Sequence, residues 1–146
     1  MKVDVLTEIV VMKPRGQVAA YTSDPDNAPE WYVNIESVEW LTPKPVSKGS
    51  RVAFVAQFLG KRLAYVYEVT EIVPDERLVM RTSEGPFPME TTYTWESLQD
   101  GSTRMTLRNR GEPRGFKMVV APLMAGAVRR ANAKDLIRVK AILESR

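Results

Sequence analysis

The sequence predicts an α+β fold: a curved antiparallel sheet of about seven strands, with two short N-terminal helices and one long C-terminal helix over a cavity. Three observations predict it. Apolar and polar residues alternate in short segments between residues 34 and 110, and turn residues separate these segments. Proline and aspartate interrupt residues 14–32, and apolar residues recur at helical spacing after residue 123. The 146 residues are a typical length for one domain, which we assign to residues 1–146.

The first 32 residues predict one strand followed by two short helices. Residues 3–11 alternate as a strand does, and the alternation ends before Pro14. Pro14 suits the first turn of a helix, and Asp24-Pro25 stops that helix and starts another. We therefore expect two helices joined at Asp24-Pro25, the second ending near Trp31.

Six further strands are expected between residues 34 and 110. The alternating segments cover residues 34–41, 50–59, 62–73, 76–85, 88–98 and 102–110. Gly60-Lys61 and Pro74-Asp75 form short turns between them, and Asp100-Gly101 is the strongest hairpin signal in the chain. Such short connections favour an antiparallel meander, to which the strand at residues 3–11 is added.

The last segment predicts a long helix from about residue 123 to residue 144. Its apolar stripe recurs at steps of three and four residues, through Val128, Asn132, Leu136, Val139 and Leu143. Pro122 is expected to start or kink this helix. The apolar run at residues 118–128 is shorter than the roughly 18 residues that indicate a membrane span. We expect no membrane span and interpret the run as the inner lining of a lid.

The composition excludes several classes of function. The chain has no cysteine and no histidine, so disulfides, thiol nucleophiles, Ser-His-Asp catalysis and His-zinc sites are all excluded. We expect no metal and no other cofactor. The net charge of +3 is not concentrated on a basic face, so we expect no nucleic-acid partner. The N-terminus lacks the apolar core of a signal peptide, which favours a cytoplasmic location.

Four segments carry a resemblance to a known family. They are SDPDNAPEWYVNIESVEWL at 23–41, YVYEVTEIVPDERLVMRTSEGPFP at 65–88, TYTWESLQDGSTRMTL at 92–107 and DLIRVKAILE at 135–144. Their order resembles the helix-grip fold of the START-like or SRPBCC superfamily and, more narrowly, the polyketide cyclase/dehydrase family of small stand-alone proteins. The resemblance implies a deep pocket between sheet and long helix that binds apolar or aromatic molecules. Some relatives cyclise or dehydrate polyketides, but the resemblance transfers no catalytic residue to this chain.

Strand parity selects the candidate ligand-binding residues. If Phe54 and Phe58 face inward, the tyrosines of the later strands lie on the same concave side, and their hydroxyls need partners when buried. Residues near the mouth and in the lid complete the set. The candidates are Trp31, Phe54, Phe58, Tyr65, Tyr67, Phe87, Met89, Thr91, Tyr93, Met105, Met118 and Leu123. For each of them, ordinary burial in the core is the alternative interpretation.

Three functions remain open from the sequence. The leading hypothesis is binding of a hydrophobic or aromatic small molecule, lipid-like or polyketide-like, without catalysis. The second is a cyclase or dehydratase that polarises its substrate with tyrosine and arginine side chains, without histidine or metal. The third is a protein-interaction or chaperone-like module that uses the basic segment at residues 108–117. We expect a small-molecule ligand as the partner, and a monomer or homodimer; no catalytic residue is assigned.

Overall fold

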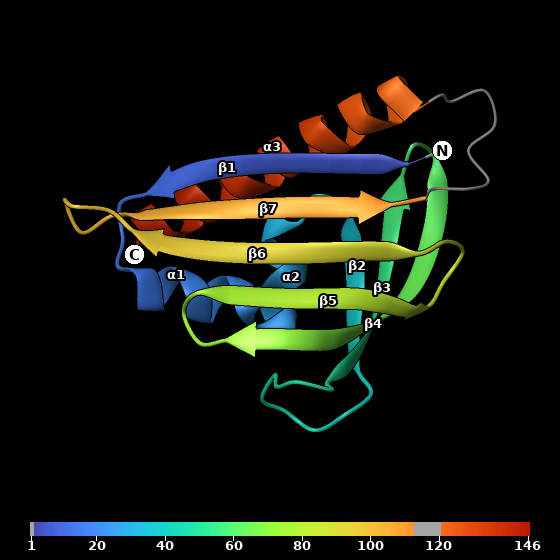
Figure 1. Cartoon of the computed structure of the whole chain (residues 1–146), viewed down its shortest axis with the longest axis horizontal. Helices are drawn as coiled ribbons and strands as arrows, with labels where there is room; N and C mark the ends of the chain where they lie inside the picture. Colours follow the sequence, from blue (N-terminus) through green and yellow to red (C-terminus); the bar gives the residue numbers. More distant parts are fainter. Residues whose placement is uncertain (1, 113–120) are drawn as a thin grey trace.

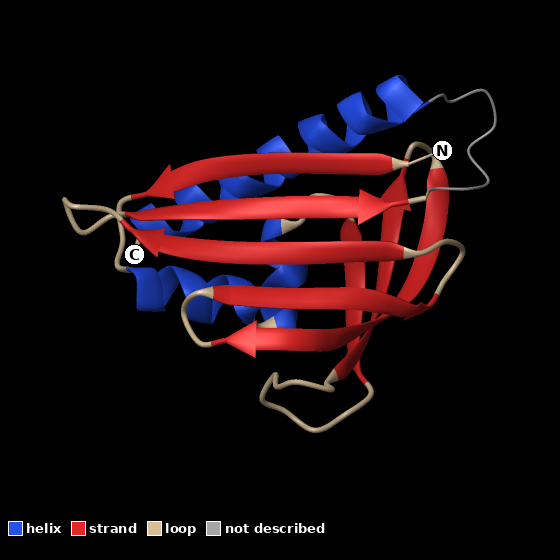
Figure 2. Cartoon of the chain, in the orientation of Figure 1, coloured by secondary structure: helices blue, strands red, loops and turns tan. Residues whose placement is uncertain are grey.

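All helices lie against one face of a single sheet (Figures 1 and 2), in a computed structural model that describes residues 2–112 and 121–146. In chain order the elements are β1 (Val3–Val11), α1 (Arg15–Ser23), the short 3-10 helix η1 (Pro25–Asn27), α2 (Ala28–Trp31), β2 (Ile35–Trp40), β3 (Arg51–Phe58), β4 (Lys61–Val73), β5 (Arg77–Glu84), β6 (Met89–Ser97), β7 (Thr103–Gly111) and α3 (Ala121–Glu144). This order confirms the predicted fold class. Within the described ranges, no helix is long and apolar enough to cross a bilayer.

The sheet is an antiparallel meander with one added strand. Its order is β1-β7-β6-β5-β4-β3-β2: β2 to β7 follow one another and β1 is added to them, as predicted, and the structure places β1 beside β7. The tight turns use left-handed backbone: Leu59 and Gly60 have φ of 50° and 74° between β3 and β4, and Gly101 has φ of 85° between β6 and β7. Positive φ values match the twist of the flanking strands, which explains why these turns could be recognised in the sequence.

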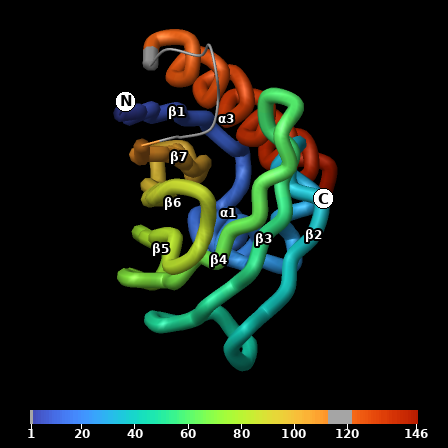
Figure 3. The backbone as a smooth tube through the Cα atoms, turned by 90° about the vertical axis from the view of Figure 1, so that its right-hand side faces the viewer, coloured from blue at the N-terminus to red at the C-terminus, as the bar shows by residue number. Residues whose placement is uncertain are grey.

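Bulges curl the sheet into a trough. The pairing of β4 with β5 shifts register between Val66 and Tyr67 and again between Val69 and Glu71, while β2 shifts against β3 near Ile35. An extra residue in one strand bends that strand and increases its twist. As a result the β2–β3 end of the sheet turns up toward α3, which runs through the trough beside β1 (Figure 3).

One end of the trough is filled by the apolar core. There, α1 and the C-terminal half of α3 pack against β6 and β7, and the Trp95 indole N–H donates to Thr22 Oγ1 at 3.0 Å. Leu136, Val139 and Leu143 are buried together with Trp95, which confirms the predicted apolar stripe of α3. Pro122 lies in the first turn of α3 and so starts the helix without kinking it.

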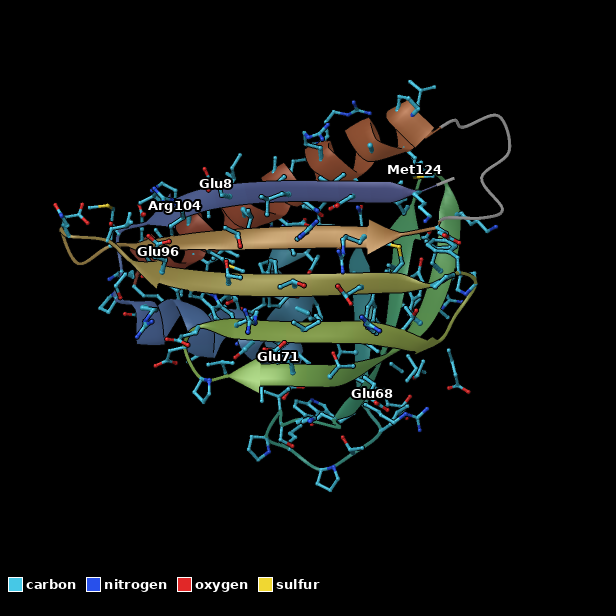
Figure 4. The ribbon with its side chains drawn as sticks, viewed as in Figure 1. Glu8, Glu68, Glu71, Glu96, Arg104 and Met124 are labelled. Carbon is cyan, nitrogen blue, oxygen red and sulfur yellow. The ribbon has the colours of Figure 1, made fainter. Side chains whose placement is uncertain are left out.

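The convex face of the sheet carries exposed ion pairs. Arg104 on β7 lies between Glu8 on β1 and Glu96 on β6, with nitrogen–oxygen distances of 3.8 and 3.6 Å (Figure 4). Arg108 pairs in the same way with Asp4 on β1, at 2.7 Å. Opposite charges on neighbouring strands stabilise a solvated sheet face only modestly.

Candidate functional site

A partly enclosed pocket of about 160 Å³ occupies the other end of the trough, between α3 and strands β3, β4 and β6. Its sheet wall is mostly aromatic and aliphatic, and its helix wall comes from residues 124–135 of α3. Met124, labelled in Figure 4, lies in the first turn of α3 and packs with Val3, Val5 and Phe58 near this end. The pocket arises because a straight helix cannot reach the floor of a strongly curled sheet.

Aromatic rings form the β3–β4 wall through edge contacts. The Tyr65 ring lies 5.7 Å from Phe87 and 5.9 Å from Tyr67, and Tyr67 lies 5.8 Å from Phe54, measured between ring centroids. Such tilted and edge-to-face contacts are favourable for aromatic quadrupoles. Gly85 allows the Tyr65 ring to take this place, because a Cβ at Gly85 would lie 2.7 Å from Tyr65 Cδ1.

Two hydrogen-bonded pairs satisfy most of the polar groups on the sheet wall. The hydroxyls of Tyr32 and Tyr93 are 2.5 Å apart, and Thr91 Oγ1 donates to Asn109 Oδ1 at 2.8 Å. Burial raises the pKa of Tyr67 to about 12, and it also raises the pKa values of Tyr32 and Tyr93. All three tyrosines are therefore neutral hydroxyls at physiological pH, and they cannot act as phenolate bases.

The helix wall contains one buried carboxyl and one buried amide. Asp135 and Asn132 are 3% and 4% exposed and both line the pocket. The Val33 N–H donates to Asp135 Oδ1 at 2.9 Å, and Asn132 Nδ2 has no acceptor within the described residues. Burial raises the pKa of Asp135 from 3.8 to about 7, against smaller lowering effects of the Val33 hydrogen bond and of Arg138. Asp135 therefore exchanges a proton near neutral pH.

Eight of the twelve candidate residues line this pocket. They are Phe54, Phe58, Tyr65, Tyr67, Phe87, Met89, Thr91 and Tyr93. Strand parity placed the strand residues on the correct face because β3 and β4 pair without a register shift from Phe58 to Arg51. The shift between Val66 and Tyr67 puts its extra residue on β5, and the extra residue on β4 comes only after Val69, beyond both Tyr65 and Tyr67. That they contact a ligand remains a prediction.

Trp31, Met105 and Leu123 lie outside the pocket wall, and Met118 lies outside the described residues. Trp31 is fully buried behind the wall, stacked 4.0 Å from Tyr32, and Met105 belongs to the core at the opposite end of the trough. Leu123 is 62% exposed because each helical residue turns by about 100°, so that Met124 takes the inward position. Residues 121–128 contribute Met124 and Val128 to the pocket, which is the part of the predicted lid that lies within the described ranges.

The sequence analysis missed the polar residues of the helix wall and the far side of the pocket. The missed residues include Tyr32, Asn34, Met80, Asn109, Asn132 and Asp135. Asp135 is the most informative omission. It lies next to Leu136 and three residues after Asn132, within the stripe that packs on the sheet, so an acidic residue on a buried helix face was the available signal.

Basic side chains do not line the described part of the pocket. Arg62, Arg104 and Arg108 are exposed and pair with acidic residues, so none of the three lines the pocket as the arginine donor that the cyclase hypothesis requires. Arg110 pairs with Glu90 on the same outer face. Two basic residues of segment 108–117 are thus engaged within the sheet, and Arg114 and Lys117 lie outside the described residues. The described residues also contain no cluster of acidic side chains that would hold a metal ion.

The family model for polyketide cyclase/dehydrase and lipid transport proteins matches residues 2–144. The chain belongs to this family. Among curated proteins, no sequence matches significantly. The family assignment confirms the resemblance seen in the sequence.

Solved structures extend the agreement to the fold of this polyketide cyclase/dehydrase family member. A START superfamily protein from Mycobacterium smegmatis superimposes with a TM-score of 0.84 at 14% identity, covering 97% of each chain. The Zhui aromatase/cyclase from a Streptomyces species gives 0.80 at 18% identity, covering 99% of this chain and 94% of its own. A major latex-like protein from Panax ginseng gives 0.76 at 12% identity, covering 96% of each. These similarities show the helix-grip fold, which is consistent with hydrophobic ligand binding.

Proposed function

We propose that this protein binds a hydrophobic small molecule in the pocket between α3 and the sheet. The observation that carries the proposal is the pocket itself. Aromatic and methionine side chains surround an unfilled volume next to a well-packed core, whereas the interface between a helix and a sheet is normally filled by side chains. Leaving such a volume empty costs stability, because its lining loses packing contacts. A ligand restores those contacts.

The size of the pocket restricts the ligand. A dry cavity of about 150 Å³ accommodates benzene, so the enclosed volume of about 160 Å³ suits one ring or a short branched chain. Because the pocket is only partly enclosed, a longer ligand extends toward its open side. Met80, Met89 and Met124 in the lining allow the wall to adapt to different shapes.

Fluorescence of the neutral probe N-phenyl-1-naphthylamine tests the proposal. Ala56 lies on the pocket wall of β3, whereas Ala64 on the neighbouring strand β4 is exposed on the other face. We expect Ala56→Trp to abolish the fluorescence increase, because the indole fills the pocket, and we expect the matched Ala64→Trp variant to bind as the wild type does. Equal binding by both variants would place the ligand elsewhere and refute the proposal. If the probe binds in the pocket, native mass spectrometry of the protein purified from its own host identifies a retained ligand.

One observation favours a second function, cyclisation or dehydration of a polyketide-like substrate in the same pocket. Asp135 has a pKa of about 7, and a general acid or base works best when its pKa is near the working pH. The Zhui aromatase/cyclase has the same fold. Under this proposal Asp135→Asn should lower turnover of a poly-β-keto thioester by about a hundredfold or more while leaving probe binding intact. Equal turnover in the wild type and the variant would exclude this role.

A further inference from the structure

Asp135 and Asn132 present a paired acceptor and donor to the pocket. They are three residues apart on α3, so their side chains lie on the same helix face, and both line the pocket. Asp135 Oδ1 accepts from the Val33 N–H. Among the described residues, Asn132 Nδ2 is a buried donor that has no acceptor. The Asn132 amide is therefore left for a molecule inside the pocket to satisfy, beside the Asp135 carboxyl, since unsatisfied buried polar groups are costly.

The described residues around this pair supply a negative charge to the pocket but no positive charge. The pocket wall contains one carboxyl group, and no lysine or arginine among its described residues. Arg138, one turn beyond Asp135, is exposed and donates to the Glu30 carbonyl at 2.6 and 3.1 Å. An anionic group inside the pocket would face the Asp135 carboxyl without a compensating buried cation, which is strongly unfavourable at low dielectric.

We propose that the pocket selects a ligand with an uncharged hydroxyl group over a carboxylate or an ammonium of the same shape, with Asp135 accepting from that hydroxyl and Asn132 donating to it. The inference rests on the proposed ligand-binding function and specifies its ligand class. A hydroxyl is both donor and acceptor, so one oxygen satisfies both side chains. A carboxylate accepts from Asn132 but is repelled by ionised Asp135, and it pairs with Asp135 only if that carboxyl keeps its proton. An ammonium satisfies only Asp135, and leaves the Asn132 amide without an acceptor.

Competition among three matched ligands tests this selection. 4-Propylphenol, 4-propylbenzoate and 4-propylbenzylamine carry the same apolar portion and are neutral, anionic and cationic at pH 8, where Asp135, with a pKa of about 7, is mostly ionised. Each is titrated against wild-type protein loaded with N-phenyl-1-naphthylamine, and the affinity is taken from the loss of fluorescence. We expect the phenol to bind at least about tenfold more tightly than either charged ligand. Equal affinities, or tighter binding of the benzoate or the amine, would overturn the proposal.

Two nearly isosteric variants assign the selection to its residues. Asp135→Asn keeps an oxygen for the Val33 N–H and removes the negative charge, so the preference for phenol over benzoate should fall to about threefold or less. Asn132→Leu removes the free donor, so the affinity for phenol should fall while that for the amine stays constant. A benzoate penalty that is unchanged in Asp135→Asn would contradict the assignment. The three wild-type affinities decide the selection itself even if a variant fails to fold.

The outcomes separate this inference from the proposed function. If the probe fails to bind, or binds equally to the Ala56→Trp variant, the pocket is not a ligand site and both proposals fail. If the probe binds in the pocket and all three ligands displace it equally well, ligand binding stands and only the hydroxyl selection fails.

Discussion

Asp135→Asn should change the pH dependence of stability in the ligand-free protein. The Asp135 carboxyl is buried, and its pKa rises from 3.8 to about 7 on folding. Each pKa unit corresponds to about 1.4 kcal/mol, so ionised Asp135 destabilises the fold by about 4 kcal/mol relative to the neutral acid. The folded-state pKa is raised, so the folded chain binds the proton more tightly. The stabilising contribution is complete below about pH 4 and is lost as the pH rises through about 7. Asparagine does not ionise and still accepts from Val33.

Urea unfolding from pH 4 to pH 8 measures this effect. The free energy of unfolding of the wild type should fall relative to that of Asp135→Asn as the pH rises, by about 4 kcal/mol over the whole interval. Leu123→Ala, which changes an exposed side chain and no titratable group, is a control in which the difference from the wild type should stay constant. A difference for Asp135→Asn that changes by less than about 1 kcal/mol, or in the opposite direction, would refute the burial argument.

Four further substitutions test the packing and the surface ion pairs. Trp31→Ala should cost about 3–5 kcal/mol of unfolding free energy because its indole is fully buried, whereas Leu123→Ala should cost less than about 0.5 kcal/mol, both measured by urea denaturation. Gly85→Ala should cost about 1–3 kcal/mol and displace the Tyr65 ring, seen as a shift of its aromatic NMR signals, because φ is 158° and the added Cβ meets the ring. Arg104→Gln should cost at most about 1 kcal/mol, and this cost should shrink in 1 M salt because the ion pairs are exposed; a cost that is insensitive to salt would contradict this.

The sheet and the long helix could be predicted from the sequence because each has a repeating signal. Alternation fixes which side of a strand faces inward, and it placed Phe54, Tyr67 and Tyr93 on the concave face as observed. The stripe through Leu136 and Leu143 likewise identified the buried face of α3. In both cases the local pattern and the tertiary packing agree.

The extent of the pocket along each strand could not be predicted, because parity carries no information about distance from α3. Met105 and Tyr93 share the concave face, yet only Tyr93 reaches the pocket; Met105 lies where α1 and α3 close over the sheet. Asp135 could not be predicted for a different reason. Apolar spacing does not single out an acidic residue in the stripe, although Asp135 is the one carboxyl group in the described pocket wall.

The trough has one end filled by the core and one end that contains the pocket, and single strands contribute residues to both ends. On β6, Thr91 and Tyr93 face the hollow end and Trp95 the filled one; on β4, Tyr65 and Val69 are divided in the same way. The core around Trp95 and the lining of the hollow are thus partly distinct sets of residues, with Tyr93 belonging to both. Met89 lines the hollow and lies outside the core clusters, whereas Phe54 also packs in a core cluster with Ala28 and Val52. Exchanging Met89 therefore alters the shape of the hollow at little cost in the free energy of unfolding, and exchanging Phe54 alters both.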